Sequence, residues 1–295
     1  MLKFKYFLIL LSYSLAFTQN NYPPKINADE TVTYKQTPQT DLKLWIFYPD
    51  NYKKNDAAAC IVFFFGGGWN AGTPEQFVEQ SKYLQQRGMV AIIADYRVRS
   101  RHDTQAIYSL KDAKSAIRWV RENSKRIGIN PNKIVGSGGS AGGHLAAATG
   151  TIKLFDEEFE NLKISSKPNA MVLFNPVLIL SPPDGFEDTY NISQERISNL
   201  KNRIGVDPKT FSPYNFINET TPPTIIFHGK DDKTVPYESV EFFDQKMKEF
   251  KNLSVIHLYE GEEHGFFNYP RKAQVPFNDT MLKTEKFLKS LGYID

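Results

Sequence analysis

The stretch that decides the fold is Ile134-Val135-Gly136-Ser137-Gly138-Gly139-Ser140-Ala141-Gly142-Gly143-His144-Leu145-Ala146-Ala147-Ala148. It starts as a short apolar strand, passes through the pattern Gly-x-Ser-x-Gly at residues 138–142, and continues as a strong helix former. Small residues around Ser140 allow a tight turn that lifts the serine hydroxyl clear of the sheet edge. The alternative is a glycine-rich connector or a phosphate-binding turn, but the usual spacing of glycines and lysine is missing. The stretch therefore predicts Ser140 as a nucleophile between a strand and a helix.

Apolar strands and amphipathic helices alternate on both sides of this turn. Residues 58–65 and 89–94 are continuous apolar runs, as expected of strands buried on both faces. Between them Thr73-Pro74-Glu75-Gln76 forms a capping box with proline at the first helical position, and this helix ends at Gly88. Because each crossover must pack back onto the sheet, the pattern predicts parallel strands with helices on both faces.

The other predicted elements surround this centre. Two alternating runs, 31–34 and 42–48, flank a turn and predict an antiparallel hairpin. A helix closed by Gly128 is predicted from an apolar face made of Leu110, Ala113, Ile117 and Val120. Further strands are expected at 170–174, 224–227 and 254–259, and further helices at 237–250 and 275–291.

Composition limits the class of protein. The chain has 295 residues, 41% of them hydrophobic and 23% charged, and no low-complexity break, so we expect one large domain at residues 31–295. A net charge of +3 provides no basic surface for nucleic acid, which is therefore not an expected partner. Cys60 is the only cysteine, so no intrachain disulfide can form. No histidines and carboxylates have metal-ligand spacing, and we expect neither a metal nor another cofactor.

The start of the chain has the features of a secretory signal peptide. A short basic lead precedes an apolar run, residues 6–15, that is too short to span a bilayer comfortably. Small residues place cleavage after Ala16 or after Thr18, and the second is favoured because a polar linker follows. We therefore expect a signal at 1–18, a linker at 19–30, and a secreted or periplasmic protein without stable membrane association. A retained membrane anchor is the alternative, although no second hydrophobic span follows.

A serine nucleophile needs a base and an orienting carboxylate, which follow the serine in strand-turn-helix sites of this kind. His264 lies in a loop between the last strand and the last helix, and this loop can reach the carboxyl edge of the sheet. We expect His264 to be the base. The other histidines are assigned differently: His102 lies upstream, His144 and His257 pack in the interior, and His228 ends a strand.

Two groups of acidic residues are candidates for the carboxylate. Asp231 and Asp232 follow a strand end, whereas Glu262 and Glu263 adjoin the histidine and would need strained geometry to contact its ring. The aspartates are the better candidates, and the residues alone do not choose between them.

Acyl transfer also needs hydrogen-bond donors where the tetrahedral oxyanion forms. The loop Phe65-Gly66-Gly67-Gly68-Trp69 supplies bare backbone amides directly after the first buried strand, and the amide of Ala141 would complete the hole. The alternative interpretation is a flexible loop.

The order of these motifs resembles that of the α/β-hydrolase superfamily over about residues 31–291. Within it, the chain is similar to the hormone-sensitive-lipase-like esterases and to the bacterial acetylxylan and feruloyl esterases. Residues 65–69 look like the His-Gly-Gly-Gly loop, Asp95-Tyr96-Arg97 like the Asp-Tyr-Arg motif, and 228–236 like the acid loop. The resemblance implies a three-layer α/β sandwich with a mostly parallel eight-stranded sheet, an N-terminal antiparallel hairpin, and little or no cap.

The resemblance also assigns roles to residues. It implies a triad of Ser140, Asp232 and His264, with oxyanion donors at Gly67, Gly68 and Ala141. Two positions depart from the family pattern. Phe65 replaces the leading histidine, so the loop must be braced from elsewhere, and Gly139 replaces an aspartate, which favours the polysaccharide-esterase branch.

These features predict a serine carboxylesterase that works through an acyl-enzyme. Secretion, a small cap and aromatic walls at Trp69 and Tyr96 favour short acyl esters, above all acetyl, on a polysaccharide or oligosaccharide. For the basic segment 97–102 two interpretations are open: it contacts uronate or sulfate groups, or Arg97 pairs with Asp95 and the other arginines are solvated, which is favoured. A prolyl-oligopeptidase-like peptidase and a non-catalytic binding module are the alternative functions.

Overall fold

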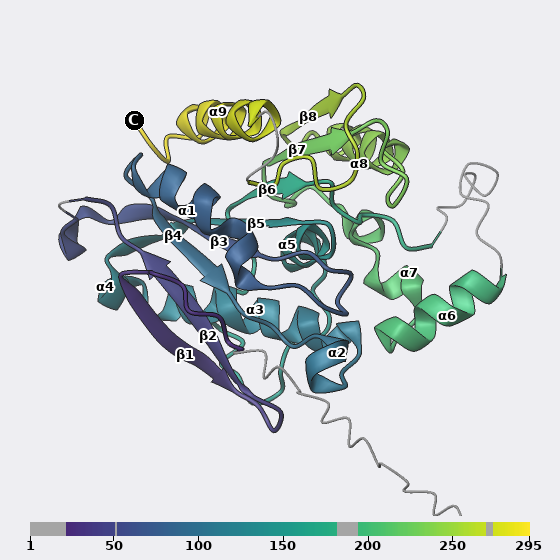
Figure 1. Ribbon diagram of the computed structural model, residues 1–295, viewed down its shortest axis with the longest axis horizontal. Helices are drawn as coiled ribbons and strands as arrows, with labels where there is room; N and C mark the ends of the chain where they lie inside the picture. The colour runs from purple at the N-terminus through teal and green to yellow at the C-terminus, as the bar shows by residue number, and fades with distance from the viewer. Residues whose placement is uncertain (1–21, 51, 182–193, 270–273) are drawn as a thin grey trace, which may run out of the picture.

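A computed structural model describes residues 22–50, 52–181, 194–269 and 274–295. The predicted signal at 1–18 lies outside these residues. Within them, one eight-stranded sheet has the order β1-β2-β4-β3-β5-β6-β7-β8 (Figure 1). The strands are β1 Glu30–Gln36, β2 Asp41–Phe47, β3 Ala58–Phe64, β4 Val90–Ala94, β5 Ile129–Gly139, β6 Ala170–Phe174, β7 Thr224–Gly229 and β8 Ser254–Tyr259.

The predicted architecture is confirmed by the pairing of these strands. β1 and β2 form the antiparallel hairpin, and β2 also pairs antiparallel with β4. All other neighbours are parallel. The carboxyl ends of β3, β5, β6 and β7 therefore meet at one edge of the sheet, where loops from distant parts of the sequence come together.

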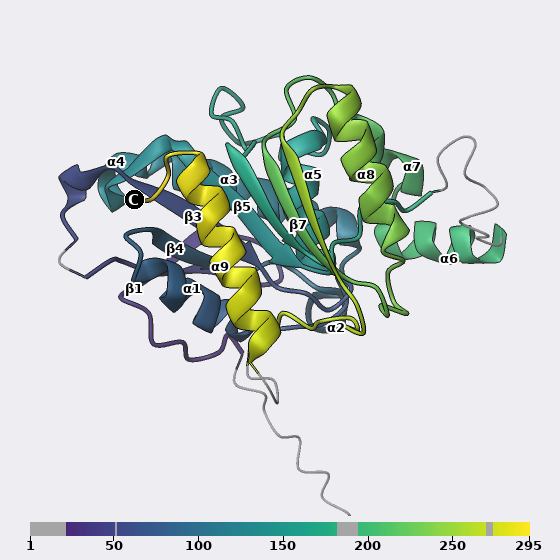
Figure 2. The ribbon, with the colours of Figure 1, turned by 90° about the horizontal axis from the view of Figure 1, so that it is seen from above.

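Helices cover both faces of the sheet. The α-helices are α1 Val78–Gln85, α2 Arg99–His102, α3 Ala106–Glu122, α4 Ser124–Ile127, α5 Ala141–Thr151, α6 Gln194–Ile204, α7 Pro208–Phe211, α8 Glu238–Glu249 and α9 Val275–Ser290. Short 3-10 helices in the described residues are η1 Lys54–Asp56, η2 Pro74–Phe77 and η3 Pro213–Phe216. Figures 1 and 2 show α1 and α9 on one side of the sheet and α3 on the other.

Two hydrophobic cores lie on the two faces, and β3 contributes to both. Cys60, Val62 and Phe64 pack with α3, α5 and α8, whereas Ile61 and Phe63 pack with α1 and α9. Alternate residues of a strand point to opposite faces, so a continuous apolar run is the pattern that a doubly covered strand requires. The apolar face predicted for the helix at 106–122 is likewise fully buried.

A buried ion cluster ties the hairpin to α3. Lys35 of β1 lies 2.7 Å from both Asp112 of α3 and Glu157. Arg97 donates to both oxygens of Asp112, at 2.8 and 2.7 Å. The predicted pairing of Arg97 with Asp95 is therefore wrong, because the guanidinium turns toward α3 and adds a second cation to the buried carboxylate of Asp112.

The connection between β6 and β7 contains α6 and α7, which the sequence interpretation missed. Figure 1 shows these two helices standing beyond the end of the sheet, next to the loops at its carboxyl edge. No helix lies in residues 22–29, so the described part of the N-terminal segment forms no cap. The β6–β7 connection, and not the described N-terminal segment, forms one wall of the cavity described below.

Candidate active site

Ser140 sits at the sharp turn between β5 and α5. Its φ of 55° and ψ of −119° lie in a strained region that is characteristic of functional turns. A Cβ atom at Gly138 would come within 2.5 Å of the Phe64 carbonyl oxygen, and one at Gly142 within 2.0 Å of the same atom. Only glycine permits this close packing of turn against β3, which explains the Gly-x-Ser-x-Gly pattern physically.

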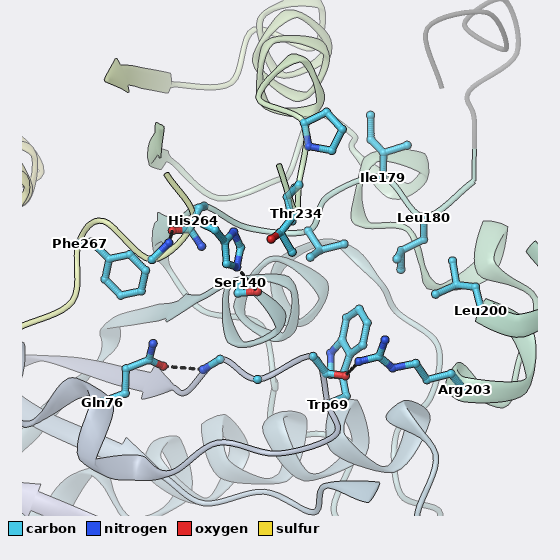
Figure 3. Close-up of a pocket in the computed structure, with 18 of the residues that line it drawn as sticks. Trp69, Gln76, Ser140, Ile179, Leu180, Leu200, Arg203, Thr234, His264 and Phe267 are labelled. Carbon is cyan, nitrogen blue, oxygen red and sulfur yellow. Dashed lines mark hydrogen bonds between the residues drawn. The ribbon is translucent and has the colours of Figure 1, made fainter. Parts of the chain in front are cut away.

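The structure brings the three predicted triad residues together at the carboxyl edge of the sheet. Nε2 of His264 lies 2.9 Å from Oγ of Ser140, and Nδ1 lies 2.6 Å from Oδ2 of Asp232 (Figure 3 shows the first contact). The carboxylate neighbour requires the hydrogen on Nδ1, so Nε2 of the ring faces Ser140 as the acceptor of the serine proton. The arrangement can therefore activate a hydroxyl nucleophile.

Asp232, and not Asp231, holds the histidine. Its Oδ1 accepts the amides of Thr234 and Val235 at 2.8 and 2.9 Å, whereas Asp231 is exposed. Burial alone would raise the pKa of Asp232, but hydrogen bonds from His228, His264 and the Val235 amide hold that pKa well below its usual range. The carboxylate is thus charged throughout the neutral range.

His228 supports this carboxylate from β7. Its Nε2 is 3.2 Å from Oδ2 of Asp232 and 3.0 Å from the carbonyl oxygen of Val235. Both neighbours are acceptors, so Nε2 carries the hydrogen. The sequence interpretation placed His228 at a strand end but gave it no part in the site; the signal was its position four residues before the acid.

The remaining histidines lie elsewhere. His144 is fully buried against Trp69 and Phe211, and burial lowers its pKa to about 4, which agrees with the predicted packing role. His257 was predicted to be a core residue, but it is only half-buried because β8 is an edge strand.

The amides of Gly67, Gly68 and Ala141 donate to no residue that the structure describes. All three lie near Ser140. Gly67 and Gly68 line the cavity into which Ser140 opens, and Ala141 follows the serine directly in the sequence. The φ of Gly67 is 119° and that of Gly68 is 61°. These values are accessible to glycine at little cost, and they leave both amides without an internal partner.

Two side chains brace the loop where the family pattern would have a histidine. Oε1 of Gln76 accepts the Gly66 amide at 2.6 Å, and the hydroxyl of Tyr96 donates to the Phe65 carbonyl at 2.6 Å. The predicted capping box is therefore wrong, because the Gln76 side chain turns to the loop and only Thr73 caps the helix. The Tyr96 prediction is also wrong: the ring is completely buried and stacks on Phe65, so it forms no substrate wall.

A cavity of about 870 Å³ opens over Ser140 and His264 (Figure 3). Trp69 lines it as predicted, although only 4% of that side chain is exposed. Further lining residues come from the β6–β7 connection and include Ile179, Leu180, Leu200 and Arg203. Among the described residues no carboxylate lines the cavity.

The basic segment 97–102 is mostly occupied by internal contacts. Arg97 lies in the ion cluster, and Arg101 donates to the carbonyl oxygen of Gly72 and stacks over the ring of Tyr22. Arg99 is exposed. Only Arg99 among the three arginines is therefore available to a substrate.

Tyr22, within the predicted linker, is anchored to the domain. Its hydroxyl donates to Oδ1 of Asp95, which also accepts the Tyr96 amide at 2.8 Å. Burial nevertheless raises the pKa of Asp95 to about 7. Tyr96 connects Tyr22 and Asp95 to the loop at 65–69, because its amide donates to Asp95 and its hydroxyl donates to the Phe65 carbonyl oxygen.

In the part of the chain that the structure describes, no group of three or more His, Cys, Asp or Glu side chains is arranged to hold a metal ion. Nor does any described helix combine the length and apolarity needed to cross a membrane.

Comparison with known proteins identifies the family of the chain. A family model described as BD-FAE matches residues 44–247. The chain belongs to the BD-FAE family. A solved esterase of the planctomycete Thermogutta terrifontis, with propionate bound, superimposes with a TM-score of 0.87 at 45% identity, covering 92% of this chain and 98% of that one.

Two curated relatives carry esterase names as well. An acetylxylan esterase of Xylanibacter ruminicola is 27% identical over 221 residues, which cover 72% of this chain and 42% of that protein. Esterase LipC of Mycobacterium tuberculosis is 27% identical over 220 residues, which cover 71% of this chain and 53% of LipC. The chain thus spans about half the length of the curated relatives it matches. The resemblance to α/β-hydrolase serine esterases is confirmed.

Proposed function

We propose that this BD-FAE family member is a serine carboxylesterase with Ser140 as nucleophile, His264 as general base and acid, and Asp232 as the orienting carboxylate. The observation that carries this proposal is the pair of contacts of the His264 ring, 2.9 Å to Oγ of Ser140 and 2.6 Å to Asp232. The esterase names of the relatives support the same reaction class.

The reaction proceeds in two steps. Oγ of Ser140 attacks the ester carbonyl carbon while Nε2 of His264 takes the hydroxyl proton, and the new oxyanion accepts hydrogen bonds from the loop amides and from Ala141. Collapse of this intermediate expels the alcohol, which receives the proton from His264. Water then attacks the acyl-enzyme by the same route and releases the carboxylic acid. Asp232 stabilises the imidazolium in both steps and keeps its charge.

The acyl group in this proposal is short, with acetyl as the first candidate. The Thermogutta terrifontis esterase was solved with propionate, a three-carbon acid, and one curated relative is named an acetylxylan esterase. An acylated polysaccharide or oligosaccharide would supply such esters outside the cell, where the signal predicted at residues 1–18 would direct the protein. Arg99 is the residue through which an acidic glycan would make contact.

A prolyl-oligopeptidase-like peptidase would use the same triad. The names of the acetylxylan esterase and of LipC support the ester hydrolase instead. A non-catalytic binding module would not need the hydrogen-bonded arrangement of Ser140, His264 and Asp232.

The test begins with an activated short-acyl ester and the full-length chain. We expect burst release of the alcohol, covalent labelling by a fluorophosphonate probe, and a loss of roughly 10³-fold or more in kcat for Ser140→Ala. Ser100→Ala is the matched control, since Ser100 is exposed. If Ser140→Ala keeps most of the activity, the mechanism is wrong.

The substrate is tested separately by acetate release from acetylated xylan against hydrolysis of a dipeptide panel. Cleavage of the peptides without acetate release would favour the peptidase. Hydrolysis of neither, with no probe labelling, would favour the binding module.

A further inference from the structure

Arg203 connects the wall of the cavity to the oxyanion loop. It lies near the end of α6, and Figure 3 shows its side chain reaching from that helix toward Trp69. Its Nη2 donates to the carbonyl oxygen of Gly68, and its guanidinium carbon lies 5.6 Å from the centre of the Trp69 ring. The guanidinium is thus held between a backbone oxygen and an aromatic face.

Several backbone groups of the loop besides its two donor amides are held by hydrogen bonds. The Gly66 amide is bonded to Gln76, and the Gly67 carbonyl accepts the amides of Asn70 and Ala71 at 3.1 and 3.0 Å. Because a trans peptide is planar, fixing the Gly67 carbonyl directs the Gly68 amide the opposite way. Arg203 fastens the next carbonyl, that of Gly68.

Gly68 needs this external fastening more than another residue would. Its φ of 61° is open to glycine without strain, but glycine is also free to leave that conformation. A Cβ at this position would lie 2.3 Å from Nη2 of Arg203, so the guanidinium occupies the space next to the bare Cα. The contact therefore fixes the peptide plane that follows Gly68, while the amides of Asn70 and Ala71 hold the plane that precedes it.

We propose that Arg203 is a positioning residue for the oxyanion hole: its hydrogen bond to the Gly68 carbonyl fixes the peptide that follows Gly68, so that Gly68 keeps the conformation in which its amide points at the reacting carbonyl. This inference rests on the proposed esterase function. Arg203 need not touch the substrate, and it acts through the backbone of the loop. It also makes the cavity wall formed by α6 part of the catalytic geometry.

The test compares Arg203→Met with Lys201→Met in the full-length chain, using p-nitrophenyl acetate. Lys201 is an exposed cation on the same helix, so its variant removes the same charge without touching the loop. Removing a whole oxyanion donor costs about 10²- to 10³-fold in kcat, and misaligning one should cost less, roughly 10- to 100-fold. We expect this loss in kcat for Arg203→Met with KM changed by less than about threefold, since the contact matters most when the oxyanion forms.

Two further measurements separate positioning from a general structural role. The melting temperature of Arg203→Met should stay close to that of Lys201→Met, and millimolar methylguanidinium should restore part of the kcat of Arg203→Ala. Arg203→Lys should lie between wild type and Arg203→Met, because lysine offers a point charge without the planar fork. If Arg203→Met is insoluble, Arg203→Gln takes its place.

The outcomes are distinct. Wild-type kcat in Arg203→Met, an equal loss in Lys201→Met, or a raised KM with unchanged kcat would each overturn the proposal. If the wild-type chain neither hydrolyses the ester nor reacts with a fluorophosphonate, the proposed esterase function is wrong. That result is independent of the Arg203 variants, so the two failures can be told apart.

Discussion

Replacing Asp232 by asparagine tests the triad at its most constrained point. The carboxylate has four contacts: Oδ1 accepts two backbone amides at 2.8 and 2.9 Å, and Oδ2 faces His264 at 2.6 Å and His228 at 3.2 Å. An amide side chain has one oxygen and one NH2 group, so it can satisfy only one of these two sides.

The cost of unpaired backbone donors determines the orientation of the asparagine side chain in Asp232→Asn. If the NH2 group faced the two backbone amides, two buried donors would lose their acceptor, at about 1–3 kcal/mol each. We therefore expect the oxygen to stay on the backbone side and the NH2 group to face the imidazoles. Nδ1 of His264 must then accept, which moves the ring hydrogen to Nε2, directed at Ser140.

This wrong tautomer cannot take the serine proton. We expect kcat of Asp232→Asn to fall roughly 10³- to 10⁴-fold, equivalent to about 4–5.5 kcal/mol of barrier, with residual activity from the oxyanion hole. Turnover of p-nitrophenyl acetate is measured alongside the melting temperature, and Asp231→Asn is the neighbouring control. Activity of Asp232→Asn above about a tenth of wild type, or an equal loss in Asp231→Asn, would refute the assignment.

Three further predictions address other groups. The raised pKa of Asp95, about 7, means that this carboxyl binds more protons in the folded protein than in the unfolded chain from about pH 4 to pH 7, so its contribution to stability falls as the pH rises through that range. In urea unfolding, Asp95→Asn should remove much of this fall and Asp103→Asn, on an exposed residue, should not; identical pH profiles would contradict the shift. Asp112→Asn leaves Lys35 and its neighbours underpaired in the buried cluster and should lower the free energy of unfolding by roughly 3–5 kcal/mol; a change below about 1 kcal/mol would show that the cluster adds little. Gln76→Leu removes the acceptor of the Gly66 amide and should reduce kcat about tenfold while KM stays nearly constant, whereas unchanged kcat would mean the loop holds its shape alone.

Local patterns predicted the elements on which the site is built. The apolar run at 58–64 is a strand because it serves two cores. The glycines beside Ser140 are required because a Cβ atom on either would lie only 2.0–2.5 Å from the Phe64 carbonyl oxygen of β3. Both requirements come from the tertiary structure, but each is met by residue types within one short segment, so the sequence displays the pattern directly. The hairpin is equally local, since its two strands are separated only by a short turn.

The choice between Asp231 and Asp232 depends on longer-range geometry. Adjacent side chains at a strand end point in different directions, and only the path of the chain from β7 to Val235 determines which carboxylate turns inward. The residue types are the same, so no local signal separates them. The family resemblance supplied the assignment that local pattern could not.

The wall of the cavity was missed for a similar reason. Arg203 and Leu200 belong to a helix with an ordinary amphipathic pattern, and nothing in that pattern states which loop the helix will lie beside. Their place next to the oxyanion loop follows from how the β6–β7 connection packs, which is a tertiary property.

The contacts of Tyr96 depend on Phe65, the residue that stands where the family pattern has a histidine. With phenylalanine at 65 in place of histidine, the loop keeps no side-chain donor at its first position, and the stack of Phe65 on Tyr96, with ring centres 4.1 Å apart, fills the space below it. That stack brings the Tyr96 hydroxyl to the Phe65 carbonyl, while Gln76 reaches the next amide from the opposite side. Tyr96 was predicted to form a wall of the substrate site. Its ring is buried instead, and its hydroxyl donates to a buried acceptor, the Phe65 carbonyl oxygen of the loop. A histidine at position 65 would have to displace this stack, so Phe65→His should weaken the bracing that the Tyr96 hydroxyl gives the loop and should lower kcat on p-nitrophenyl acetate.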